Sequence, residues 1–154
     1  FLRFVQQIEK QSSDDTLIFF ALDSPEKSFR ADIDINYKAN RPPAPEDLKK
    51  QLPIAIEWLE LMGYATLIEK GFEADDIIAS IAFIAKNKGL EVEVLSHDKD
   101  LIQLIDNNVY LTDPLKKKKM DKKACFEKYG VEPEYFTQYQ ALIGDSADNI
   151  LGVK

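Results

Sequence analysis

Apolar residues in the first half of the chain change from helical spacing to short continuous runs. Over residues 1–10 they recur at the interval of one helical turn, which predicts a helix. Residues 16–23 (TLIFFALD) form an almost unbroken apolar run, typical of a strand buried on both faces of a sheet. Asp23 then falls at the carboxyl end of that strand.

Residues 46–62 have a strong amphipathic pattern. Pro45 precedes this segment and Gly63 follows it, as expected at the two ends of a helix. The apolar side of the predicted helix would carry Leu48, Leu52, Ala55, Ile56, Leu59 and Met62. A short strand is predicted next, at residues 65–69.

The second half continues the alternation of helices and strands. The predicted elements are helices at 74–88, 99–106, 121–129 and 133–143 and strands at 91–96 and 109–112. Strands separated by helices predict an α/β domain with a mostly parallel central sheet and helices on both faces. Ligands of such sheets bind beyond the carboxyl ends of the strands.

Composition is compatible with one domain over residues 1–154. The chain is 45% hydrophobic, which allows a sizeable core. It contains no apolar run near the roughly 20 residues of a membrane span and no visible signal peptide, so we expect a cytoplasmic protein with no membrane partner. The single cysteine, Cys125, excludes an internal disulfide and is interpreted as a partly buried thiol in a helix.

Eight acidic residues form short clusters where predicted strands end or helices begin. They are Asp23, Glu73, Asp75, Asp76, Asp98, Asp100, Asp145 and Asp148. Two carboxylates about 4 Å apart repel by about 1 kcal/mol in water and about 4 kcal/mol at an effective dielectric of roughly 20. Gathered carboxylates therefore need cations, and oxygen ligands favour Mg²⁺ or Mn²⁺ over Zn²⁺. We expect phosphoryl chemistry with divalent metal.

Spacing within the clusters predicts which carboxylates point the same way. Glu73 and Asp76 are three residues apart at a helix start and would share one face. Asp98 and Asp100 are two apart after a strand, so an extended backbone would project both to one side. The pair after Gly144 repeats the helical spacing of three. Capping of a helix N-terminus is the alternative role for each such pair taken alone.

The net charge of the chain and the local charge of residues 28–47 indicate different binding partners. A net charge of −7 and a pI near 4.8 argue against a nucleic-acid partner. Residues 28–47 nevertheless carry Arg30, Lys38 and Arg41 in a proline-rich segment predicted to be a long excursion over the sheet edge. Lys38 and Arg41 are three residues apart and would project together from a helical turn. Arginine and lysine there could bind phosphate, although a solvated polar loop is the alternative.

Five sequence segments, in order, resemble a known family. They are LDSPEKSFR, YKANRPPAPEDL, GFEADDIIAS, HDKDLIQL and GDSADNILGVK. Together they resemble the 5′ nuclease domain at the N-terminal end of bacterial DNA polymerase I, of the flap endonuclease superfamily. The resemblance covers residues 22–154 and implies a PIN-like fold with an arch segment above the metals and the start of a helix-hairpin-helix.

The resemblance implies a two-metal 5′-3′ exonuclease that hydrolyses phosphodiester bonds in DNA flaps, nicks or RNA primers during replication and repair. The eight acidic residues match the metal residues of the family, for two Mg²⁺ or Mn²⁺ ions about 4 Å apart. Lys38 and Arg41 match its catalytic basic pair. Arg30 and Tyr37 match neighbouring nucleic-acid-binding positions, a phosphate contact and a stacking surface.

The family pattern also implies what this chain lacks. No counterpart of the family's first strand and its Asp-Gly motif is visible, and the chain stops inside the helix-hairpin-helix, so we expect a domain truncated at both ends. The full-length domain would bind K⁺ at that motif, act as a monomer and be fused to a polymerase domain. Leu151 replaces the usual proline, His97 is not counted as a ligand, and lysine-rich residues 116–123 are predicted to be a solvated hairpin tip.

Two alternatives stay open. One is a catalytically incompetent fragment that still binds DNA or metal. The other is an unrelated acidic phosphotransferase, such as a receiver or a haloacid-dehalogenase-like phosphatase, which also places aspartates at strand ends. The phosphatase pattern is disfavoured because no Thr or Val follows Asp98-Lys99-Asp100-Leu101, and because it leaves the basic segment unexplained.

Overall fold

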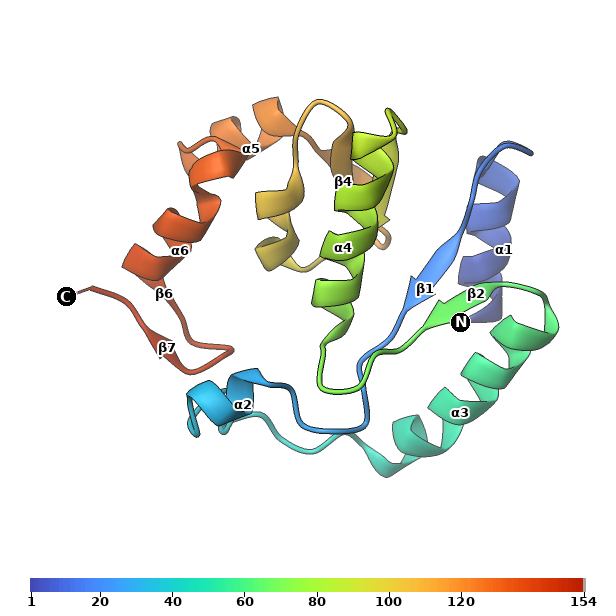
Figure 1. The fold of residues 1–154 in the computed structure, drawn as a ribbon, viewed down its shortest axis with the longest axis horizontal. Coiled ribbons are helices and arrows are strands. Elements are labelled where there is room, and N and C mark those ends of the chain that lie inside the picture. The colour runs from blue at the N-terminus through green and yellow to red at the C-terminus, as the bar shows by residue number, and fades with distance from the viewer. Residues whose placement is uncertain (154) are drawn as a thin grey trace.

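The computed structural model describes residues 1–153, in which helices and strands alternate as predicted (Figure 1). In the first half these are α1 (Leu2–Gln11), β1 (Phe19–Ala21), α2 (Arg30–Ile33), α3 (Glu46–Leu61), β2 (Ala65–Leu67) and α4 (Ala74–Asn87). In the second half they are β3 (Val92–Leu95), η1 (Lys99–Leu104), β4 (Val109–Asp113), β5 (Lys118–Met120), α5 (Lys122–Tyr129), η2 (Pro133–Tyr135), α6 (Phe136–Ile143), β6 (Gly144–Asp145) and β7 (Ile150–Leu151). The α/β class is confirmed.

The strands form three small sheets within residues 1–153, so the prediction of one central sheet is wrong for this part of the chain. Strands β1 and β2 pair in parallel, as do β3 and β4, while β5 and β7 pair antiparallel with β4 and β6. Helix α4 contacts both β1 and β3, which places the two parallel pairs on one helix (Figure 1). None of the described strands pairs with both β1 and β3. A strand in that position would be needed to make the two parallel pairs one continuous sheet.

Strand β1 differs most from its prediction. It covers only Phe19–Ala21 and is not buried on both faces, since Phe19 is 46% exposed. The apolar run predicted burial, but β1 pairs on one edge with β2 alone among the described residues. Burial on both faces requires covering layers that a local sequence pattern does not specify.

Helix α3 is confirmed, but half of the residues on its apolar side are exposed. Leu59 is 1% exposed, whereas Leu48, Leu52 and Met62 are exposed. The helix packs on β2 near its C-terminal end. Its remaining turns extend past that contact, so amphipathic spacing predicted the helix correctly and its burial incorrectly.

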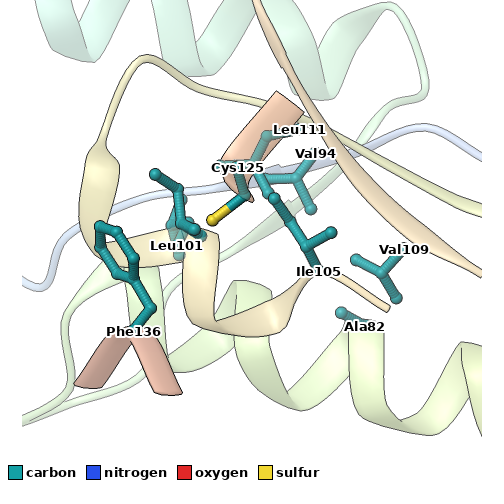
Figure 2. Packing of buried hydrophobic residues seen from close by; sticks show 9 residues of the cluster. Ala82, Val94, Leu101, Ile105, Val109, Leu111, Cys125 and Phe136 are labelled. Atoms are coloured by element: carbon teal, nitrogen blue, oxygen red, sulfur yellow. The ribbon is translucent and has the colours of Figure 1, made fainter. Parts of the chain in front are cut away.

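The hydrophobic core lies in the second half of the chain and is shown in Figure 2. Its buried members are Ala82, Val94, Leu101, Ile102, Ile105, Val109, Leu111, Cys125 and Phe136. They lie in or directly beside α4, β3, η1, β4, α5 and α6. The segments that follow β3 therefore pack on the hydrophobic core. Cys125 lies on a helix, α5, as predicted, but it is fully buried rather than partly buried, and burial raises the pKa of its thiol.

The lysine-rich residues 116–123 were predicted to form a hairpin tip. They lie in the β4–β5 hairpin and in the first turn of α5. Asp121 caps α5 by accepting a hydrogen bond from the Ala124 amide at 2.9 Å, and Gly130 ends that helix with φ +73°. Among the described residues, none of the helices combines the length and the apolarity needed to cross a membrane.

Candidate metal centre and arch segment

The start of α4 is fixed by reciprocal capping. The Glu73 amide donates to Asp76 Oδ2 at 3.0 Å, and the Glu73 side chain accepts from the Asp76 backbone. These two side chains therefore cap the N-terminus of the helix, which was the alternative role for a pair with their spacing. Asp23 Oδ1 accepts from the Ala74 amide at 2.8 Å, which joins the end of β1 to the same helix start.

The arch segment, residues 28–47, lies beside the start of α4 and contains the short helix α2. Its Arg30 guanidinium forms a two-pronged ion pair with Asp76, at 2.7 and 2.8 Å. This hydrogen bond lowers the pKa of Asp76 and raises the pKa of Arg30. The bidentate geometry fixes the beginning of the arch segment to the capping residue of α4.

Lys38 and Tyr37 both contact Glu73. Lys38 Nζ lies 2.7 Å and the Tyr37 hydroxyl 3.1 Å from Glu73 Oε2. Burial lowers the pKa of Lys38, but its hydrogen bonds outweigh burial and the pKa is raised. Lys38 also has φ +54°, a left-handed conformation that costs a non-glycine residue about 1–3 kcal/mol. Its amide donates to the Asp148 carbonyl at 3.3 Å.

Arg41 contacts a different acidic residue from Lys38. Its guanidinium forms an ion pair with Asp148, and Asn40 Nδ2 donates to the Ser146 carbonyl at 3.0 Å. The prediction that Lys38 and Arg41 project together is therefore wrong. Lys38 reaches Glu73 at the start of α4, whereas Arg41 reaches Asp148 in the β6–β7 turn. That turn lies beside α2 (Figure 1).

Asp100, Asp145 and Asp148 form the tightest acidic group in the described residues. Each offers one carboxylate oxygen, and these oxygens lie within 4.8 Å of one another. Asp148 is 7% exposed, and the Asp145 side chain is 11% exposed. Two nearly buried carboxylates and the half-buried one of Asp100, at this separation, match the oxygen donor set of a hard divalent cation.

The local backbone of this group differs from prediction. Asp145 lies on β6 and Asp148 in the following turn, so the helical spacing predicted for them is wrong. Gly144 ends α6 with φ +78°, and a Cβ there would lie 2.3 Å from the Gly152 amide nitrogen. Glycine permits both the turn and the close approach. The tight turn, in place of a helix, brings the two carboxylates together.

Asp98 and Asp100 are also arranged by a turn. Asp98 Oδ1 caps η1 by accepting from the Asp100 amide at 2.9 Å. The extended backbone predicted through Asp100 is therefore wrong, because the chain enters the 3-10 helix at Lys99. Asp100 nevertheless faces Asp145 and Asp148, because η1 is packed on the core through Leu101 and Ile102.

The pKa values indicate where negative charge is left without compensation. Burial, and after it the nearby carboxylates of Asp98 and Asp23, raise the pKa of Asp75 to about 6. Burial also raises the pKa of Asp100, and Asp98 and Asp145 act in the same direction. Asp75 and Asp100 are therefore close enough to their acidic neighbours to be repelled by them. A divalent cation would relieve that repulsion.

The structure adds two residues that the sequence did not indicate. Lys99 Nζ lies 3.0 Å from Asp145 Oδ2, and this ion pair outweighs burial to lower the pKa of Asp145. Gln140, on α6, donates a hydrogen bond to Asp100. Lys99 lies between two candidate aspartates, a signal that could have singled it out. For Gln140 there was no comparable signal, because its role depends on tertiary packing.

The predicted acidic residues thus fall into three groups. Asp100, Asp145 and Asp148 share the tight site, while Asp23, Asp75 and Asp98 influence one another electrostatically beside it. Glu73 and Asp76 are instead paired with arch-segment cations. His97 is exposed and is not in the tight site.

Comparison with known proteins places the chain beside DNA-processing enzymes. The family model described as "5'-3' exonuclease, N-terminal resolvase-like domain" matches residues 1–130. A 5'-3' exonuclease of Aquifex aeolicus is 39% identical over all of this chain and 53% of its own length. A DNA polymerase I of Helicobacter pylori is 43% identical over 94% of this chain and 16% of its own length. The chain thus spans about half the length of the 5'-3' exonuclease it matches.

Solved structures support the fold. A bacteriophage T5 protein co-crystallised with metal ions matches with a TM-score of 0.78 at 24% identity, over 99% of this chain and 61% of that one. A mutant T5 5'-exonuclease matches with a TM-score of 0.79 at 24% identity, over 99% of this chain and 58% of that one. The fold of this chain is therefore that of a 5'-exonuclease domain.

We predict that Asp75→Asn stabilises the metal-free protein at neutral pH. The folded protein holds the Asp75 proton up to a pKa of about 6, above its ordinary value of 3.8, so ionisation of Asp75 reduces stability as pH rises through that window. Asparagine cannot ionise. In EDTA, thermal unfolding of the variant should depend less on pH between about 4 and 7, and its Tm should be higher at pH 7.

The matched control is Asp15→Asn, at an exposed position in the α1–β1 connection. It should follow the unmodified protein across the same pH range. In millimolar Mg²⁺ the unmodified protein should have a higher Tm than Asp75→Asn, the reverse of their order in EDTA. The reason is that the unmodified protein gains more stability from bound ion than Asp75→Asn does. Identical pH profiles for all three proteins would contradict the crowding of carboxylates around Asp75.

Proposed function

We propose that this chain, which belongs to the family of 5'-3' exonuclease N-terminal resolvase-like domains, provides the metal-binding and catalytic surface of a structure-specific 5′ nuclease. The observation that carries the proposal is the tight group of Asp100, Asp145 and Asp148 next to the cations of the arch segment. One surface can therefore hold divalent metal and contact a phosphate. Hydrolysis of phosphodiester bonds in nucleic acid needs both.

The donor set fits Mg²⁺ or Mn²⁺. Asp100, Asp145 and Asp148 would hold one ion, and Asp23, Asp75 and Asp98 would bind at the adjoining position or through water. All these ligands are carboxylate oxygens, and no cysteine or histidine belongs to the tight group among the described residues. When bound, two such ions supply Lewis-acid stabilisation of the attacking and leaving oxygens of a phosphodiester.

Glu73 and Asp76 have a different proposed role from the one their sequence match implies. Each is already compensated by an arch-segment cation, Lys38 or Arg30, at 2.7 Å. Asp145 and Asp148 also have a cation partner, but Glu73 and Asp76 differ from them in capping α4 and in lying outside the tight group. Glu73 and Asp76 would therefore act on metal mainly through water, and would hold the arch segment at the edge of the site. The same two acidic residues of the GFEADD segment also cap α4.

The arch-segment cations would hold the scissile phosphate. Lys38 and Arg41 are both partly exposed, and each is paired with a carboxylate that borders the site. Their positive charges can offset charge that develops on a phosphate during hydrolysis. Arg30 would add a further phosphate contact, and the ring of Tyr37 offers a surface on which a base can stack.

The substrates proposed are DNA 5′ flaps, nicks and RNA primers, as encountered in replication and repair. A T5 flap endonuclease in a pseudo-enzyme-product complex with DNA and metal ions shares this fold, with a TM-score of 0.75. The polymerase I relatives are consistent with fusion to a polymerase domain. We further propose that the whole protein is a monomer and binds K⁺ at a helix-hairpin-helix, of which α6 and the β6–β7 hairpin would be the beginning.

A labelled 5′-flap substrate tests the proposed function. We expect cleavage in Mg²⁺ or Mn²⁺ and none in EDTA, because the carboxylate group would be without metal. Asp145→Asn should abolish cleavage, while Asp15→Asn should not change it. Metal-dependent flap binding without any cleavage would contradict the catalytic proposal and identify the chain as a binding module. Absence of both binding and cleavage would reject the nuclease assignment altogether.

Lys38→Ala should lower turnover far more than substrate affinity. Removal of one preorganised donor to a developing charge typically reduces kcat by about 10²- to 10³-fold. Lys50→Ala, on the exposed surface of α3, is the matched control and should change neither quantity. Single-turnover kinetics and a binding titration separate the two effects. Equal losses in turnover and affinity would show that Lys38 is only a phosphate anchor.

A further inference from the structure

A second positive surface lies outside the arch segment, in what we call the lysine hairpin, residues 114–123. It contains six lysines among ten residues, and all six side chains are exposed. The one acidic residue of this stretch, Asp121, is occupied as the cap of α5. Since the whole chain has a net charge of −7, the lysine hairpin is a local exception to an acidic protein.

The backbone of the lysine hairpin is well ordered by its own hydrogen bonds. Asp113 Oδ1 accepts from the amides of Leu115 and Lys116, both at 2.9 Å, and the Asp113 carbonyl accepts from the Lys117 amide at 2.8 Å. Lys117 closes the turn with φ +52°. The lysines are thus presented from a defined turn, in which the backbone is already ordered before any partner binds.

Few of these ammonium groups are neutralised within the protein. Lys116 and Lys123 each have a carboxylate only at 3.8 Å, and Lys119 lies over the ring of Tyr110 at 3.4 Å. Among the described residues, Lys117 and Lys118 have no carboxylate within ion-pair distance. Two adjacent exposed charges are therefore available to an external anion.

The lysine hairpin lies at the same sheet edge as the candidate metal centre. Strands β3 and β4 are parallel, with Leu95 opposite Thr112, and the Ser96 amide donates to the Thr112 carbonyl at 3.1 Å. Both strands therefore end together. The chain leaving β3 reaches Asp98 within three residues, while the chain leaving β4 enters the lysine hairpin.

We propose that the lysine hairpin binds the phosphate backbone of the nucleic-acid duplex beside the cleaved position. This inference rests on the proposed function and adds a second contact surface to it. Exposed lysines act as point charges toward phosphate, without base specificity. A polyanion held at this edge would be kept beside the catalytic carboxylates despite the overall negative charge of the protein.

The test is the salt dependence of DNA binding by the double variant Lys117→Glu/Lys118→Glu. Each phosphate contact contributes about 0.9 to the slope of log K against log salt concentration, so loss of two contacts should reduce the slope by about 2. Fluorescence anisotropy with a labelled flap duplex in EDTA measures this slope without cleavage. Affinity at fixed salt should also fall, and circular dichroism should show an unchanged fold.

The matched control is Lys10→Glu/Lys50→Glu, which makes the same change in net charge at exposed positions on α1 and α3. Its slope should equal that of the unmodified protein. If the unmodified protein binds and cleaves the flap while the Lys117/Lys118 variant keeps the full slope, the lysine hairpin proposal is overturned and the proposed function stands. If the unmodified protein binds no DNA, both are overturned.

A competing partner would be an acidic polypeptide. If the partner is an acidic polypeptide, the unmodified protein should bind poly-glutamate and the Lys117→Glu/Lys118→Glu variant should not. The salt-dependence slope of DNA binding should then be the same for both proteins. That result would overturn the nucleic-acid assignment. Loss of DNA slope in the variant, with short cleavable substrates that lack the flanking duplex still hydrolysed at the normal rate, would support it.

Discussion

Repulsion among carboxylates at one edge of the fold is the constraint to which the rest of the site responds. The protein offsets part of it with its own cations: Arg30, Lys38, Arg41 and Lys99 each pair with a different acidic residue. Among the described residues, Asp75 and Asp100 have no cation partner, and burial together with their acidic neighbours raises the pKa of each. The protein thus compensates part of the acidic site and leaves negative charge at Asp75 and Asp100, which a divalent metal ion would balance.

Two kinds of support hold this arrangement. The hydrophobic core fixes η1 and α6, so that Asp100 and its hydrogen-bond partner Gln140 lie on packed elements. The remaining support is polar and runs through the arch segment, which joins α4 to the β6–β7 turn by side-chain contacts. The arch segment therefore closes the site with the same charges that are proposed to contact substrate, and nucleic acid would have to compete with Glu73 and Asp148 for them.

The sequence predicted most elements, because helical spacing and short apolar runs are local properties. It also identified the acidic residues of the tight group. It failed where the answer depended on distant neighbours, as at β1, whose apolar run is partly exposed and which pairs among the described residues with β2 alone. It failed again where the backbone left regular structure: Lys38 is left-handed, and Asp145 and Asp148 lie on a strand and in a turn rather than at helical spacing. Neither local conformation has a spacing signal.

The central claim is that Asp100, Asp145 and Asp148 bind divalent metal. Anomalous diffraction from crystals of the protein grown in Mn²⁺ tests this most directly, because manganese scatters anomalously and carbon, nitrogen and oxygen scarcely do. The account predicts an anomalous peak within ordinary metal–oxygen bonding distance, about 2.0–2.6 Å, of these carboxylates. Crystals in which these three carboxylates remain without a peak in millimolar Mn²⁺ would contradict it.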